Sequence, residues 1–284
     1  MRRIVVRKGE QLSDEESRQV QLGVLLELER FCREHELTYV LAFGTLIGAM
    51  RHEGFIPWDD DIDVYMPRAD FERLYGLSRS GALPEHLRLT SYRDRNSIYP
   101  FFKLVDTRTH VEESYVGVEQ DLGLWVDIFP LEHVDFADRR IRLTRLRALR
   151  HVWKRSIAAS DPHLATSWRA ALVKRLIYPV TRRMNPYEIA RRSDELARAA
   201  HVADAKDPRY VMLVDNDMDN NTLRPEDLLP VRRTLFEGAM LPIPARAEDV
   251  LTARYGDWRR VPSPEERPPA HVRTATWAAS DDAR

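Results

Sequence analysis

The chain has 284 residues, 43% of them hydrophobic, which is enough to bury the core of one large domain or of one and a half domains. Its 44 basic and 45 acidic residues leave a formal net charge of −1, so no general electrostatic attraction to nucleic acid or to an acidic membrane is expected. The single cysteine, Cys32, excludes an internal disulfide and a cysteine-rich zinc site.

The first expected element is a helix over residues 13 to 37. Ser13 and Glu16 have the spacing of a capping box, in which each side chain accepts a hydrogen bond from the other residue's backbone. The apolar residues that follow recur at helical spacing, and Cys32 belongs to this stripe as a small buried hydrophobe. We therefore expect this helix to pack its apolar face on the core.

The rest of the chain alternates short apolar runs with turn residues and then becomes helical. Residues 138 to 204 lack glycine and are rich in alanine, arginine and leucine, which predicts a helical insertion. The other expected elements, in order, are a strand at 39–42, a helix at 45–51, a strand at 61–66, a helix at 67–77, strands at 86–92, 101–106, 111–115, 124–129 and 210–214, and a helix at 246–254.

This order predicts an α+β fold, a mixed β-sheet flanked by helices. We expect residues 1–132 to form the catalytic core, 133–208 a helical insertion, 209–261 a C-terminal part packed on the core, and 262–284 an extended tail. No segment approaches the roughly 20 apolar residues of a membrane span. The N-terminus also lacks the apolar run of a signal peptide, so we expect a cytoplasmic protein.

The strongest chemical signal is the acidic run DDDID, residues 59 to 63. So many carboxylates close together are unfavourable unless a cation lies among them, and hard oxygen ligands select Mg²⁺, Mn²⁺ or Ca²⁺. Asp61 and Asp63 are two residues apart on an expected strand, so their side chains share a face and can converge on one metal. A solvated acidic loop is the alternative, and the apolar neighbours Trp58 and Ile62 argue against it.

A second signal, Gly44-Thr45, lies where an expected strand leads into a short helix. Glycine lets the backbone approach a ligand, and the helix N-terminus offers backbone N–H groups to a phosphate. Together with the acidic run, this pair predicts a phosphate-binding site beside a metal. That combination suits a nucleoside diphosphate donor.

The stretch AFGTLIGAMRHEGFIPWDDDIDV, residues 42 to 64, closely resembles the signature of the LicD family of phosphotransferases, relatives of fukutin and fukutin-related protein. That family belongs to the nucleotidyltransferase-fold superfamily. The segment LWVDIFPL around Asp127 resembles a later family segment, and weaker likenesses lie at 241–244 and at Tyr255-Gly256-Asp257. No family motif is matched between about 133 and 230.

The resemblance implies a nucleotidyltransferase-like fold and a metal-dependent transfer of a substituted phosphate. The group would be phosphocholine or a polyol phosphate, moved from a CDP-linked donor to a sugar, glycan or lipid-linked glycan of the cell surface. Asp61 and Asp63 would bind one or two Mg²⁺ or Mn²⁺ ions. Asp127, the third carboxylate, would bind a second metal or accept the acceptor's proton, and an ordinary strand aspartate is the alternative.

Gly44 and Thr45, with Arg51 and Lys103, are the expected contacts to donor phosphates. Arg51 has the alternative of a surface residue at a helix end, favoured by the helix dipole. Two other functions use the same residues: a nucleotidyltransferase that modifies a small molecule, and a non-catalytic nucleotide-binding relative. No nucleic-acid partner is expected, and peripheral contact with the inner face of a membrane is left open.

Overall fold

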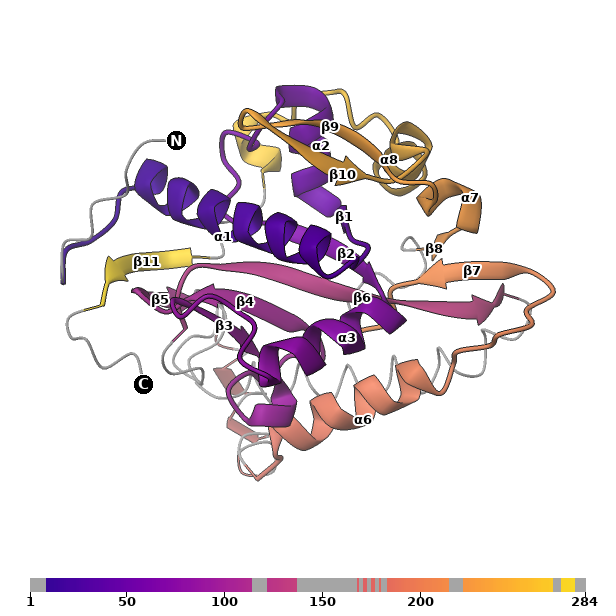
Figure 1. Cartoon of the computed structure of the whole chain (residues 1–284). Coiled ribbons are helices and arrows are strands. Elements are labelled where there is room, and N and C mark those ends of the chain that lie inside the picture. Colours follow the sequence, from indigo (N-terminus) through magenta and orange to yellow (C-terminus); the bar gives the residue numbers. More distant parts are fainter. Residues whose placement is uncertain are drawn as a thin grey trace.

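The computed structural model is an α+β arrangement of helices on a curled mixed sheet (Figure 1). It describes residues 9–113, 122–136, 183–214, 222–267 and 272–278, and six single residues between 168 and 179. Within these residues the main sheet has seven strands, five of them in the order β1-β2-β6-β4-β3, with β7 on β6 and β8 on β7. Their bounds are β1 (Val40–Leu41), β2 (Asp63–Pro67), β3 (Leu87–Thr90), β4 (Phe102–Asp106), β6 (Trp125–Asp135), β7 (Pro208–Val211) and β8 (Thr222–Leu223).

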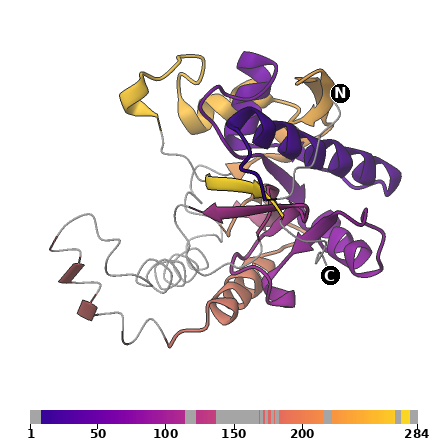
Figure 2. The ribbon, with the colours of Figure 1, turned by 90° about the vertical axis from the view of Figure 1, so that its left-hand side faces the viewer.

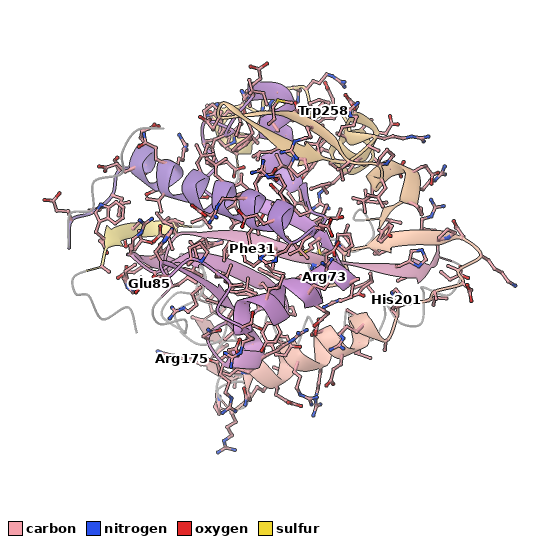
Figure 3. The ribbon with its side chains drawn as sticks, in the orientation of Figure 1. Phe31, Arg73, Glu85, Arg175, His201 and Trp258 are labelled. Atoms are coloured by element: carbon pink, nitrogen blue, oxygen red, sulfur yellow. The ribbon has the colours of Figure 1, made fainter. Side chains whose placement is uncertain are left out.

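Helices α1 (Asp14–Glu34) and α3 (Arg68–Arg79) cover one face of this sheet. The predicted capping box of α1 is confirmed, because the Glu16 N–H donates to the Ser13 hydroxyl at 3.3 Å and the Ser13 N–H donates to the Glu16 carboxylate at 2.9 Å. Phe31, which is only 3% exposed, lies where α1 passes over the sheet (Figure 3). The capping box and the apolar stripe therefore predicted each end of this helix to within three residues.

The strands alternate between two faces, as a sheet requires. Val64, Leu104 and Ile128 are fully buried and pack with α1 and α3 in one core. The predicted inward direction of Val64 and Ile128 is thereby confirmed. The residue directly before each of them points to the opposite face, and all three of these residues are charged: Asp63, Lys103 and Asp127.

Strand β6 is longer than the sequence predicted. Residues 124–129 were expected, but the strand continues to Asp135 because β7 pairs antiparallel with residues 132–135. The expected boundary between 132 and 133 thus falls inside a strand. The division of the chain into four parts stays a prediction.

Within the predicted helical insertion, the described helix is α6 (Pro186–Arg198). Asn185 caps its N-terminus, and the Asn185 side chain accepts from two first-turn N–H groups. Helix α6 packs on the short 3-10 helix η1 (Tyr92–Asp94) and lies next to α3 beneath the strands (Figure 2). Most of residues 138–182 lie outside the described residues. Among the described helices, none is both long and apolar enough to cross a bilayer.

The C-terminal part of the chain packs against elements from the first half of the sequence. The predicted helix at 246–254 is confirmed as α8, but a β-hairpin before it was not predicted. The tail contains a strand, β11, which pairs antiparallel with β5. The bounds of these elements are β5 (Thr109–Glu113), α7 (Pro225–Leu228), β9 (Arg232–Phe236), β10 (Ala239–Ile243), α8 (Ala247–Tyr255), η4 (Pro264–Glu266) and β11 (Val272–Trp277).

Candidate active site

Three charged side chains form a row on the sheet face opposite α1 and α3. Asp63 of β2 is in register with Asp127 of β6, and Asp127 with Lys103 of β4. Registered residues on adjacent strands place their side chains on one face, about 5 Å apart. They are 9%, 7% and 2% exposed, respectively. The structure therefore brings together three residues that the sequence predicted separately.

Asp127 is contacted through both carboxylate oxygens. The Lys103 Nζ lies 3.1 Å from Oδ1 and forms an ion pair with it. The indole N–H of Trp125 donates to Oδ2 at 3.0 Å. Burial raises the pKa of Asp127 to about 6, the Lys103 charge opposes this rise, and the Asp61 charge adds to it. A carboxyl with such a pKa is suited to accept a proton near neutral pH.

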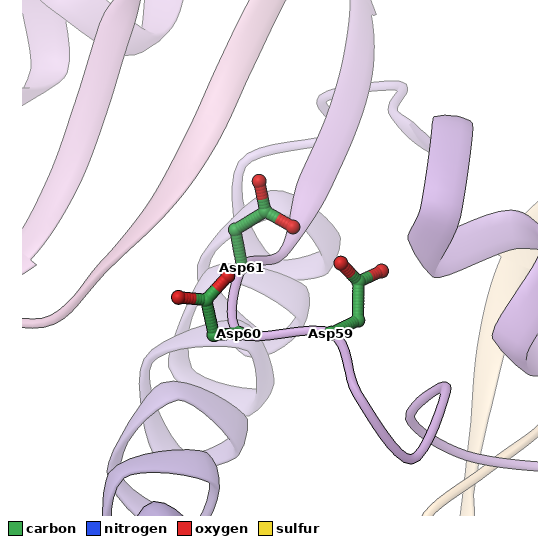
Figure 4. A group of neighbouring side chains, drawn as sticks. All are labelled: Asp59, Asp60 and Asp61. Atoms are coloured by element: carbon green, nitrogen blue, oxygen red, sulfur yellow. The ribbon is translucent and has the colours of Figure 1, made fainter. Parts of the chain in front are cut away.

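Asp59, Asp60 and Asp61 lie in the loop before β2, each with a carboxylate oxygen within 4.8 Å of the others (Figure 4). This group could bind a metal ion. The carboxylates of Asp59 and Asp61 point to one side of the loop and that of Asp60 to the other. The prediction that Asp61 lies on the strand is wrong, because the pairing of β2 with β6 starts at Asp63.

The backbone of the acidic run is held between α1 and β11. The Arg18 guanidinium donates to the carbonyl oxygen of Asp59 at 3.3 Å, and the Gln21 amide donates to that of Asp60 at 2.8 Å. The Asp60 carboxylate accepts from the Val272 N–H at 2.7 Å. Asp60 therefore anchors the C-terminal strand, whereas the charge of Asp61 acts on Asp127.

The Gly44-Thr45 pair lies in the first turn of α2 (Phe43–His52), next to the acidic run. A Cβ on Gly44 would lie 2.4 Å from an oxygen of Asp59, so a side chain at this position would displace the Asp59 carboxylate. The Thr45 hydroxyl accepts from the Asp63 N–H at 2.8 Å. The first-turn N–H groups of a helix have no intrahelical acceptor. The predicted phosphate cradle thus lies beside the carboxylates, while the Thr45 hydroxyl fixes the start of β2.

Arg51 lies at the other end of α2, about 10 Å along the helix axis from Gly44. Its guanidinium donates to the carbonyl oxygens of Trp258 and Arg260, at 2.8 and 3.0 Å. Figure 3 shows Trp258 beside α2 and α8. The structure does not bring Arg51 to the row of Asp63, Asp127 and Lys103. This placement favours a role in joining α2 to the segment after α8.

Helix α8 instead brings Arg254 and Tyr255 to the first turn of α2. The Arg254 guanidinium lies over the Phe43 ring, 4.3 Å from its centroid, and 5.2 Å from that of Tyr255. Tyr255 is 41% exposed, yet burial around its hydroxyl raises its pKa; Arg254 opposes this, and the charges of Asp63 and Asp59 add to it. A guanidinium and a phenol therefore lie near the carboxylates.

Sequence reasoning missed Trp125 and Arg254. Trp125 lies two residues before Asp127 on one strand, so the period of two could have placed both side chains on the same face. Arg254 directly precedes the Tyr255-Gly256-Asp257 segment, but its approach to Phe43 joins residues 211 positions apart. Only the folded chain shows that contact.

Two comparisons with known proteins bear on the sequence around this site. Residues 36–103 match the family model described as "LicD/FKTN/FKRP, nucleotidyltransferase domain". The chain is also 26% identical, over 265 residues, to "Lipopolysaccharide cholinephosphotransferase LicD" of Haemophilus influenzae, which covers 92% of this chain and 96% of that relative.

Residues 36–103 thus carry a domain of the LicD type.

The matched segment contains Gly44, Thr45 and the acidic run, and it ends at Lys103. Asp127 lies 24 residues beyond the segment, although β6 places it between Asp63 and Lys103. The similarity to the Haemophilus protein extends over most of the chain and reaches well past the matched segment. The candidate site thus combines residues inside the matched segment with Asp127, which lies outside it.

Proposed function

We propose that this protein transfers a substituted phosphate, of the phosphocholine or polyol phosphate type, from a CDP-linked donor to a hydroxyl of a sugar or glycan acceptor. The observation that carries the proposal is the gathering of carboxylates beside the first turn of α2. Asp63 is in register with Asp127, the charge of Asp61 acts on Asp127, and the Asp59 carboxylate lies against Gly44. The similarity to a protein named a lipopolysaccharide cholinephosphotransferase supports this choice of phosphoryl group and acceptor.

A divalent cation, Mg²⁺ or Mn²⁺, belongs to this proposal. The donor atoms fit it, because the acidic run supplies clustered carboxylate oxygens and those are the ligands these ions prefer. Asp61 and Asp63 would hold the ion, with Asp59 assisting. When bound, such an ion neutralises charge on the donor diphosphate and on the leaving nucleotide.

The remaining chemistry falls to residues of the chain. The acceptor hydroxyl oxygen attacks the phosphorus that carries the head group, and the bond from that phosphorus to the bridging oxygen breaks, so CMP leaves. The acceptor proton passes to a base, for which Asp127 has the raised pKa. First-turn N–H groups at Gly44 and Thr45 bind donor phosphate, and Arg254 takes the phosphate-binding role that the sequence assigned to Arg51.

The test is CMP release from CDP-choline or CDP-ribitol, with Mg²⁺ and a glycan acceptor, followed by mass analysis of that acceptor. We expect Asp61→Ala and Asp63→Ala to lower the rate by at least about a hundredfold, the scale of damage to a metal site. Asp249→Ala, at an exposed position of α8, is the matched control and should keep full activity. Full activity in either Asp61→Ala or Asp63→Ala, with the fold checked by circular dichroism, would sink the proposal.

The same reaction mixtures separate the other two functions. A nucleotidyltransferase would release pyrophosphate from CTP or ATP and leave a nucleoside monophosphate on its acceptor. A non-catalytic relative would bind CDP-choline in the presence of Mg²⁺ without releasing CMP. The length of the similarity to a cholinephosphotransferase favours the phosphotransferase.

A further inference from the structure

Lys103 is a buried ammonium held by aromatic rings. It is 2% exposed, and its Nζ lies 3.8 Å from the ring centroid of Trp125 and 4.7 Å from that of Tyr99. The Phe101 ring is 5.9 Å away. The negative faces of aromatic rings attract a cation, and more strongly where water is excluded. This corner of the sheet therefore stabilises one positive charge at a fixed position.

The Lys103 ammonium contacts one carboxylate oxygen of Asp127, and the Trp125 indole contacts the other. Lys103 Nζ contacts Oδ1 at 3.1 Å, while the Trp125 N–H holds Oδ2 at 3.0 Å. Trp125 thus contacts both members of the pair, one through its N–H and the other through its ring. Such a pair, buried and contacted by one indole, is held in place by groups of the chain itself.

The acidic run differs from the Lys103–Asp127 pair in its charges. The carboxylates of Asp59 and Asp61 lie close together there, and the Lys103 ammonium does not lie between them. In the row, Asp127 stands between Asp63 and Lys103. A cation at Asp61 and Asp63 has Asp127 between itself and the ammonium. A second cation on Asp127, at the roughly 4 Å spacing of two-metal sites, would meet the ammonium directly and be repelled.

We propose that the Lys103 ammonium takes the place of a second metal ion, so that this site binds one divalent cation, at Asp61 and Asp63, and Asp127 is not a second-metal ligand. The inference rests on the metal dependence of the proposed function and makes it more specific. It selects the proton acceptor from the two roles that the sequence left open for Asp127. The Lys103 ammonium then supplies a fixed positive charge. Unlike a metal ion, it cannot leave the site together with the nucleotide.

The test is a count of bound Mn²⁺ per chain, by electron paramagnetic resonance of the free ion and by calorimetry, in the absence of any donor. We expect one Mn²⁺ per chain in the wild type and in Lys103→Arg, which keeps the charge. Lys103→Met removes the charge at similar length and should bind two. Lys206→Met, at an exposed lysine, is the matched control and should bind one.

If the Lys103→Met variant loses stability because the buried Asp127 carboxylate has lost its cation, the melting temperature tests the inference. Mn²⁺ should then raise its melting temperature by more than it raises that of the wild type, because the ion replaces the missing charge. The double variant Lys103→Met/Asp127→Asn should lose this extra gain and return to one Mn²⁺. Two ions in the wild type, or one ion and an ordinary melting shift in Lys103→Met, would overturn the inference alone. A wild type that binds no Mn²⁺ would overturn the proposed metal dependence as well.

Discussion

Asp127 is the carboxylate of the candidate site whose pKa burial raises. It is 7% exposed, lies in register with Asp63, and feels the charge of Asp61. A buried carboxylate without compensation is costly, so the Lys103 ammonium and the Trp125 N–H are needed to keep it charged at all. Its pKa of about 6 is the balance between that burial and those contacts.

This balance predicts a pH-dependent stability in the presence of a chelator. Below the ordinary pKa of 3.8, Asp127 is protonated in both states and its contribution is complete. As the pH rises toward about 6, the unfolded chain releases the proton and the folded chain retains it, so the stability falls. We expect Asp127→Asn to lack this fall, which is up to about 3 kcal/mol. Urea unfolding of both proteins between pH 4 and 7 measures it, and parallel curves would contradict it.

Arg254 gives a second prediction at this scale. If its guanidinium binds donor phosphate, Arg254→Gln should raise the KM for the donor by about ten- to a hundredfold, as for a lost hydrogen bond to a charged group. Arg254→Lys keeps the charge but not the planar fork and should lie between. Arg259→Gln changes an exposed arginine that stacks on Trp258 instead, and steady-state kinetics should show it unchanged. Equal KM values in all the variants would remove Arg254 from the site.

At the scale of elements, a buried ion network joins α3, β6 and α6. Arg68 donates to Glu132 at 2.7 Å and lies 2.9 Å from Asp194, and both carboxylates are fully buried. The Tyr92 hydroxyl donates to Asp194 at 2.6 Å, and Arg93 lies 3.1 Å from it. Burial raises the pKa of Glu132 although Arg68 opposes it. The network therefore docks α6 on the catalytic sheet through charge.

Removing the central cation of this network should be severe. We expect Arg68→Ala to lower the free energy of unfolding by about 3–5 kcal/mol, because it leaves two buried carboxylates without their shared partner. Arg192→Ala, which breaks a surface pair between Arg192 and Glu188 on α6, should change little. Urea denaturation measures both. If both variants lost a similar free energy of unfolding, burial of the Arg68 ion pairs would not add to their contribution.

At the scale of the whole molecule, the apolar interior holds the thiol of Cys32. This residue is 1% exposed within the core formed by α1, α3 and the sheet, and burial raises the pKa of its thiol. Both effects suppress the reactive thiolate. The sequence interpretation of Cys32 as a small buried hydrophobe is confirmed.

The same burial makes Cys32 a probe of global unfolding. Since the chain has one cysteine, the native protein should not react with a thiol reagent such as DTNB over minutes at pH 8. One equivalent should react in denaturant. The absorbance of released thionitrobenzoate measures both, and rapid reaction of the native protein would show that α1 opens far more easily than its packing implies.

The local signals of the sequence determined much of the fold. The capping box and apolar stripe gave α1, and alternation gave β2 and the inward direction of Val64 and Ile128. Turn residues gave β3 and β4 within a few positions. The hairpin β9–β10 was missed. These signals act over one or two turns or strands, so one sequence contains them in readable form.

By itself the sequence also predicted which residues would carry the chemistry: the carboxylates of the acidic run, the Gly44-Thr45 pair and Asp127. Only the tertiary structure decided how they meet. Strand register placed Asp127 between Asp63 and Lys103, and long-range packing turned Arg51 toward Trp258 and brought Arg254 to α2. Such contacts join residues tens to hundreds of positions apart, and no local pattern encodes which distant strand or helix end becomes a neighbour.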